Sequence, residues 1–258
     1  MATPTPALTV EIAGRRWRVG TQGRDISIPL EFDGPQPKFF GARPAAAEVV
    51  AAGSFVGDVR RGGSCNCATY TLTPHCNGTH TECLGHVTAE RLSVRDLSTE
   101  HLSAALLVSV ASVPVITRDV LASAVTPHEL SHYRALVVRT IPNTRDKLER
   151  NYDRAPAPYF DADAMRWIVD RGIVSLVVDL PSLDRSDDPE LTAHRIFWGL
   201  PPAASNAAQA TRPNAMVTEL AFIDDSIDDG QYLLNLQVAP FVADAAPSRP
   251  ILLPLTPP

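Results

Sequence analysis

The chain has 258 residues, of which 45% are apolar and 20% are charged, a composition typical of a globular protein and unlike that of a disordered one. Lys and Arg total 23 against 29 Asp and Glu, and the net charge of -6 argues against nucleic acid or an anionic membrane as the main partner, since binding phosphates needs clustered basic residues. No apolar run approaches the roughly 18 residues that span a bilayer, and the first nine residues lack the parts of a secretory signal, so we expect a soluble, cytoplasmic protein.

Strand patterns are numerous along the chain, and helical patterns are fewer. Segments with alternating, β-branched or continuous apolar character predict strands at residues 8–19, 26–32, 105–115, 135–140, 173–178, 232–238 and 251–255. Helices are expected at residues 45–52, 118–124 and 162–171. The last is the clearest, because Asp161 can cap its first turn and Gly172 can end it. Many strands with few helices indicate an α/β domain with a mixed sheet.

The ends of the chain and one internal segment lack a regular pattern. We expect a single domain over residues 1–258, in which the Pro-rich ends 1–7 and 254–258 are loose. Residues 200–214 are rich in Pro, Ala, Ser and Asn and predict a long loop. Loops of this length inside a compact domain are usually functional or disordered.

All four cysteines, Cys65, Cys67, Cys76 and Cys83, fall within 19 residues, which is too local to cross-link a chain of this size. Their spacing does not match the paired C-x2-C knuckles of structural zinc sites well. The sequence leaves two interpretations open, reduced thiols or a cysteine-containing zinc site.

Three of the seven histidines, His75, His80 and His86, lie within twelve residues, and Glu82 stands among them. Neutral imidazoles and carboxylates are natural ligands of zinc and manganese, and an acid between histidines can bridge two ions. His80 and Glu82 are two residues apart, so both would point to the same side of an extended segment. These features favour a metal site, and the alternative is a polar surface loop with coincidental histidines.

Polar residues further along the chain are ambiguous when taken alone. The predicted strand 173–178 runs into Asp179-Leu180-Pro181-Ser182-Leu183-Asp184, a position common for sites in α/β folds, although the residue types also suit a plain turn. His194 lies beside an apolar stretch and by itself suggests a core histidine. Glu219 stands in an apolar run, and a buried carboxylate there needs an arginine or a metal as partner, unless it lies on a wet face.

Together these segments resemble the metal-dependent cyclase superfamily, which includes bacterial kynurenine formamidase and isatin hydrolase. The resemblance spans about residues 25–255 and rests on the order of Asp25-Ile26-Ser27-Ile28-Pro29-Leu30, the Gly78-Thr79-His80 cluster, the 179–184 loop, His194 and Glu219. It implies an α/β fold of the swivelling β/β/α type, a single domain with mixed β-sheets and few helices.

In that family the cluster reads His-x-Gly-Thr-His-x-Asp-x-Pro-x-His, and the resemblance assigns roles by position. The implied metal ligands are His75, His80, Glu82, His194 and Glu219. His86 would be the catalytic acid/base, Phe40 would contact substrate, and Asp179, Ser182 and Asp184 would orient metal-bound histidines. Glu82 replaces the usual aspartate, and Cys76 occupies the family's register for the first histidine; we expect His75 to be the ligand because the Pro74-His75 pair is kept.

The resemblance implies a metal-dependent amidohydrolase, arylformamidase-like, that holds one or two Zn or Mn ions. It would cleave the C–N or C–O bond of a small amide, formamide or lactone by metal-activated water, with His86 as proton carrier. The implied partner is a small-molecule substrate, without nucleic acid or membrane, and the implied assembly is a homodimer or homotetramer. The alternative is a catalytically silent member of the fold that binds a metal or small molecule.

Overall fold

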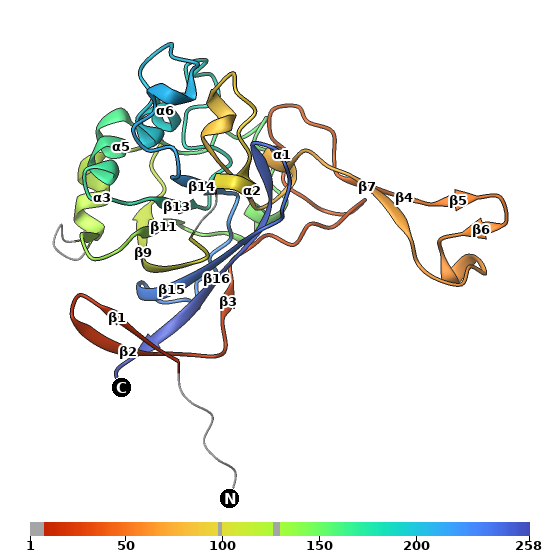
Figure 1. Ribbon diagram of the computed structural model, residues 1–258, viewed down its shortest axis with the longest axis horizontal. Coiled ribbons are helices and arrows are strands. Elements are labelled where there is room, and N and C mark those ends of the chain that lie inside the picture. The colour runs from red at the N-terminus through yellow and green to blue at the C-terminus, as the bar shows by residue number, and fades with distance from the viewer. Residues whose placement is uncertain (1–7, 98–99, 126–129) are drawn as a thin grey trace, which may run out of the picture.

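The computed structural model describes residues 8–97, 100–125 and 130–258, and its centre is a barrel-like sheet (Figure 1). The sheet closes because β8 pairs with both β14 and β16. The closed ring comprises β8 (His80–Glu82), β9 (Leu102–Ala111), β11 (Ala135–Ile141), β13 (Ser175–Val178), β14 (Met216–Glu219), β15 (Gly230–Val238) and β16 (Ala245–Thr256). Three further strands extend the sheet from β16. β2 (Arg15–Val19) and β3 (Arg24–Asp25) pair with β16, and β1 (Thr9–Ile12) pairs with β2.

Four of the barrel strands, β9, β11, β13 and β14, run parallel, and their neighbours β8 and β15 run antiparallel to them. All residues of β13 and all but the last of β11 are buried, which is why these strands read as continuous apolar runs in the sequence. The strands predicted at residues 105–115, 135–140, 173–178, 232–238 and 251–255 are present, with shifted ends. The mixed α/β fold class with few helices is confirmed.

Helices cover one side of the barrel (Figure 1), and a large apolar core lies between the two layers. Leu136 and Val138 of β11 pack in this core with Met165 and Ile168 of α5. The neighbouring Val137 belongs to a second core, formed by alternate residues of the barrel strands. The α-helices within the described residues are α1 (Pro74–Asn77), α2 (Val94–Leu97), α3 (Arg118–Ala124), α5 (Ala162–Val169) and α6 (Thr192–Trp198).

Two of the predicted helices are confirmed. α3 spans residues 118–124 as expected, and α5 covers most of the predicted 162–171. Asp161 caps α5, since its carboxylate accepts a hydrogen bond from the Ala164 N–H at 2.7 Å. Gly172 follows with a φ of +76°, in the left-handed region that glycine favours.

The predicted helix at residues 45–52 is wrong. β4 (Ala46–Val49) pairs with β7 (Ala68–Thr71), and β5 (Ala51–Ala52) pairs with β6 (Phe55–Val56) through a turn at Gly53. These strands form a ribbon, here called the arm (residues 46–71), that extends from the barrel (Figure 1). Alanine's helix propensity is a weak local preference, and cross-strand pairing overrides it here.

Other boundaries also differ from expectation. Residues 8–19 form a hairpin, β1 and β2, because Ala13 and Gly14 turn the chain with positive φ. Residues 26–32 contribute only an isolated bridge at Ser27 and no strand. Residues 254–256, expected to be loose, lie in β16, where Leu255 and Thr256 pair with β2. The predicted loose end 1–7 lies outside the described residues.

The loop predicted at residues 200–214 is present, and its only regular element is the single turn at Ala207–Gln209. Two further short strands, β10 (Val115–Ile116) and β12 (Tyr159–Phe160), pair with each other. Among the helices in the described part of the chain, none is long and apolar enough to cross a membrane.

Candidate metal centre

The barrel closure brings the histidine cluster against Glu219. β8 and β14 are antiparallel neighbours, and their register sets His80 opposite Glu219. His80 Nε2 lies 3.5 Å from Glu219 Oε2, and both side chains are buried. His80 and Glu82 are two residues apart in β8, so their side chains share one side of the strand, as the spacing predicts.

Glu82 lies at the centre of the site. Its side chain is 1% exposed, and its Oε1 lies 2.7 Å from His194 Nε2. Its other oxygen, Oε2, lies 3.1 Å from His75 Nδ1 and 3.7 Å from His86 Nε2. Glu82 therefore belongs to two groups of donors, His75, His80 and Glu82, and Glu82, His194 and Glu219; within each group the donor atoms lie within 4.8 Å of one another.

Several buried polar atoms of this centre make no hydrogen bond of acceptable geometry. They are His80 Nε2, both carboxylate oxygens of Glu82, and His194 Nε2. Leaving such atoms unsatisfied costs about 1–3 kcal/mol each, and more for charged groups. Their types, imidazole nitrogen and carboxylate oxygen, are ligands of zinc and manganese. The residues therefore fit a divalent cation, shared through Glu82 if two ions bind.

His194 is held in place by Asp184. Its Nδ1 lies 2.6 Å from Asp184 Oδ2, which leaves Nε2 directed at Glu82 and Glu219. Its ring stacks on Trp198 with centroids 5.5 Å apart. His194 is thus buried, as a core histidine would be, but both of its nitrogens face carboxylates.

The loop before α6 also positions the centre. Ser182 Oγ accepts a hydrogen bond from the Asp184 N–H at 3.2 Å, and the Leu183 N–H donates to Glu219 Oε1 at 2.8 Å. Asp179 is not brought to the centre. Its carboxylate contacts Thr140 and lies 2.6 Å from Lys147 Nζ, and burial raises its pKa.

Cys76 and Phe40 pack in apolar contacts. Cys76 is buried in an apolar group with Phe39 and Leu220, and burial raises the pKa of its thiol to about 11. No cysteine of the described residues belongs to a metal-compatible group, and all four cysteines are free thiols. Phe40 is 68% exposed and packs edge-on against Phe39.

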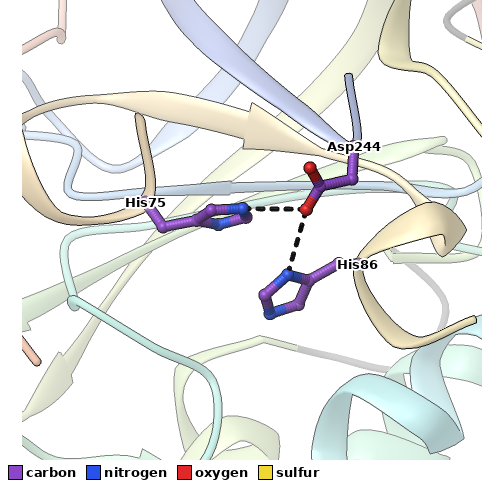
Figure 2. A group of neighbouring side chains, drawn as sticks. All are labelled: His75, His86 and Asp244. Carbon is purple, nitrogen blue, oxygen red and sulfur yellow. Dashed lines mark hydrogen bonds and ion pairs between the residues drawn. The ribbon is translucent and has the colours of Figure 1, made fainter. Parts of the chain in front are cut away.

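Asp244 is a member of the cluster that the sequence did not indicate. Its Oδ2 lies 3.0 Å from His75 Nε2 and 3.3 Å from His86 Nδ1, as Figure 2 shows. It directly precedes β16, whose first residue, Ala245, pairs with Glu82. Only this pairing places it here, since Asp244 lies 158 residues beyond His86 in a segment without a motif.

The charges of the cluster perturb one another strongly. Burial acts to lower the pKa of His75, but its contacts with the carboxylates of Asp244 and Glu82 outweigh burial and raise the pKa to about 10. Burial likewise opposes the charged form of His194, yet Glu82 and Asp184 raise its pKa well above the usual value. Burial acts to raise the pKa of Glu82, and the charges of His86 and His194 reverse this and lower it. Without a cation, the centre therefore retains protons.

Comparison with known proteins agrees with this geometry. The Cyclase family model matches residues 24–185, which is more than half of the chain, and the chain belongs to this family. Among curated relatives, the kynurenine formamidase of Bacillus cereus is 26% identical over 194 residues, covering 75% of this chain and 82% of that protein. The kynurenine formamidase of Bacillus anthracis is 25% identical over 232 residues, covering 90% and 97%.

Solved structures share the fold. Isatin hydrolase A from Labrenzia aggregata, bound to benzyl benzoate, superposes with a TM-score of 0.63 at 14% identity, covering 90% of this chain and 93% of that one. A predicted metal-dependent hydrolase from Bacillus stearothermophilus gives a TM-score of 0.57 at 16% identity, covering 90% and 98%. The fold is thus that of the cyclase and isatin hydrolase type, and the named relatives are hydrolases.

Proposed function

We propose that this protein is a metal-dependent hydrolase that cleaves the C–N or C–O bond of a small amide, formamide or lactone. The observation that carries the proposal is the position of Glu82 between two groups of donors, His75 with His80 and His194 with Glu219. Nε2 of His80, Nε2 of His194 and both carboxylate oxygens of Glu82 are buried there without a hydrogen bond. The relatives named kynurenine formamidase and isatin hydrolase support this reaction class.

His75, His80, Glu82, His194 and Glu219 would hold one or two divalent cations, zinc or manganese. When bound, such an ion acidifies water and polarises a carbonyl group. Asp184 keeps Nε2 of His194 available on the inner side of the ring. The Leu183 N–H holds one oxygen of Glu219. His194 and Glu219 are therefore already oriented to serve as ligands.

His86 is the proposed proton carrier. Its Nε2 lies 3.7 Å from Glu82 Oε2, and its side chain is 26% exposed, so it reaches both the buried donors and the solvent side. His86 would accept a proton from the attacking water as the new C–O bond forms, and it would return that proton to the nitrogen or oxygen released when the old bond breaks. An imidazole is suited to both steps near neutral pH.

A cavity of about 400 Å³ is lined by Asp244 and by Gly85, the residue before His86. Small-molecule sites usually measure about 300–1,000 Å³. We therefore propose that the substrate is a small molecule that enters beside His86. Contact of Phe40 with the substrate stays a prediction.

We also propose that the working form is a homodimer or homotetramer. Among the described residues, none of the buried residues of the apolar cores belongs to the arm, and Val59 and Tyr70 on it are exposed. A two-stranded ribbon is marginally stable by itself, so contact with a second copy would stabilise it. Light scattering of the full chain tests this proposal, and a monomer at micromolar concentration would contradict it.

The test of the reaction uses protein loaded with zinc or manganese and three substrate types: an N-formyl aromatic amine, a lactone and a cyclic aromatic amide. His86→Ala should lower kcat by about 10²–10⁴-fold, with the metal content unchanged. His101→Ala, at an exposed histidine, is the matched control and should retain wild-type turnover. If wild-type protein binds metal but turns over none of the substrates faster than His86→Ala, the catalytically silent alternative is favoured.

A further inference from the structure

We infer that Asp244 is a positioning residue that sets the tautomer and orientation of both His75 and His86. This inference rests on the proposed function for the roles of the two histidines. It assigns to one carboxylate two separate tasks: directing a ligand nitrogen of His75 inward, and directing the proton-carrying nitrogen of His86 toward the reaction site.

In both rings, one nitrogen faces Asp244 and the other faces Glu82. His75 presents Nε2 to Asp244 Oδ2 at 3.0 Å and Nδ1 to Glu82 Oε2 at 3.1 Å. His86 presents Nδ1 to the same Asp244 oxygen at 3.3 Å and Nε2 to Glu82 Oε2 at 3.7 Å. A histidine that binds a metal or accepts a proton must be neutral, with one N–H and one lone pair. Because Asp244 can only accept, it selects the tautomer whose lone pair faces Glu82 in both rings.

The shared oxygen also fixes the two rings relative to each other. Their centroids are 4.4 Å apart and their planes differ by 33°, with Asp244 bridging them on one side (Figure 2). Neither ring is deeply enclosed, since each side chain is 26% exposed. Packing alone therefore restrains these rings less than it restrains the fully buried His80 and His194, and a hydrogen-bonding anchor has more to contribute.

The backbone holds Asp244 firmly at this place. Its carbonyl oxygen accepts a hydrogen bond from the Cys83 N–H at 3.0 Å, and the Ala243 carbonyl accepts one from the Val94 N–H at 2.9 Å. The next residue, Ala245, pairs with Glu82 in the sheet. The closure of the barrel thus sets the carboxylate in register with the residues that it orients.

His75, His86 and Asp244 would also suit a third cation by residue type, since their donor atoms lie within 4.8 Å of one another. Their contacts favour hydrogen bonding instead. Both histidines use these nitrogens to pair with Asp244, whereas the unsatisfied atoms of the cluster belong to His80, Glu82 and His194. Asp244 is also 41% exposed, so it remains partly hydrated.

The test compares Asp244→Asn and Asp244→Ala with Asp163→Asn, a control at a carboxylate that is 77% exposed on α5. Partners that orient metal ligands typically change metal affinity or activity by about 10–100-fold. We expect each Asp244 variant to weaken zinc binding, measured by chelator competition, and to lower kcat, each by about 10–100-fold, with KM changed by less than about threefold. The control should match the wild type in all three quantities.

Ring ¹⁵N shifts of the zinc-loaded protein give a readout that does not depend on turnover. The wild type should show His86 protonated at Nδ1 and His75 protonated at Nε2, and Asp244→Ala should show mixed tautomers for His86. Unchanged tautomers and zinc affinity in both variants would overturn the inference. Loss of one whole zinc equivalent, with kcat retained, would also overturn it, because that result identifies a third cation site.

The failure of the proposed function is distinguishable from the failure of this inference. If wild-type protein hydrolyses no formamide, lactone or cyclic amide, the hydrolase proposal is wrong. The zinc affinity and the ring ¹⁵N shifts then still decide the role of Asp244, with the same expected and contrary outcomes.

Discussion

Replacing Asp184 with asparagine should weaken both the metal centre and the helix that carries His194. The carboxylate contacts His194 Nδ1 at 2.6 Å and accepts hydrogen bonds from the Ala193 and His194 N–H groups at 2.5 and 3.2 Å. These N–H groups belong to the first turn of α6, where the capping residue, Leu191, supplies no side-chain acceptor. Asp184 therefore caps α6 although it lies outside the helix, and it also orients His194.

The two effects have separate magnitudes. Hydrogen bonds to a buried charged group contribute about 1.5–3 kcal/mol, and asparagine retains one acceptor oxygen, so we expect Asp184→Asn to lower the free energy of unfolding by about 1–3 kcal/mol. Loss of the charged partner of a metal-binding histidine should weaken zinc binding by about 10–100-fold. At about 1.4 kcal/mol for each factor of ten, this corresponds to about 1.4–2.8 kcal/mol.

Urea denaturation of the metal-free protein measures the first effect, and competition with a chromophoric zinc chelator measures the second. Asp187→Asn is the matched control, because Asp187 lies in the same loop, is 72% exposed and pairs with Arg185 in a surface ion pair of little expected energy. If Asp184→Asn binds zinc within threefold of the control and unfolds at the same urea concentration, Asp184 neither caps α6 nor orients His194 for metal binding.

Three further predictions concern the same centre. His75→Ala should weaken zinc binding at least tenfold, whereas Cys76→Ala should leave it within about twofold, because the Cys76 thiol lies in an apolar group; equal losses would contradict the assignment. Zinc binding at pH 7 should release protons and strengthen as pH rises, because the metal-free centre raises the pKa of His75 to about 10 and that of His194 well above 6.5, and calorimetry in buffers of different ionisation enthalpy should detect the release. In the metal-free protein, the stabilising contribution of these histidines is complete below pH 6.5 and is lost as pH rises toward 10. The lowered pKa of Glu82 gives a contribution that is lost on acidification. The urea midpoint should therefore be highest near pH 5–6.5 and fall on both sides, and a flat profile would show that these groups are not coupled to folding.

Local patterns identified the elements whose cause is local. α3 and α5 were predictable because a capping residue and an apolar face are encoded within a few neighbouring positions, and Asp161 forms the expected cap. β11 and β13 were predictable because strands buried on both faces must be apolar throughout. Side chains alternate between the two sides of a strand, and this alternation predicted that His80 and Glu82, two residues apart, share one side of β8.

Local patterns failed where the deciding partner is distant. The alanines at residues 46–52 form strands because β7 and β6 pair with them, and residues 254–256 are ordered because β2 lies beside them. Asp179 was expected near the histidines, yet it pairs with Lys147. In each case the partner's position depends on chain folding and not on the residue's own neighbours.

The sequence by itself determined the ingredients of the candidate site: the closely spaced histidines, the acid between them, and the order of His194 and Glu219 further along the chain. Only the tertiary structure decided that Glu82 lies between two donor groups, that Cys76 faces an apolar group, and that Asp244 joins the histidines. The physical reason is that a metal site with several ligands needs donor atoms within a few ångströms of one another. Residues more than a hundred positions apart reach that distance only because strand pairing closes the barrel.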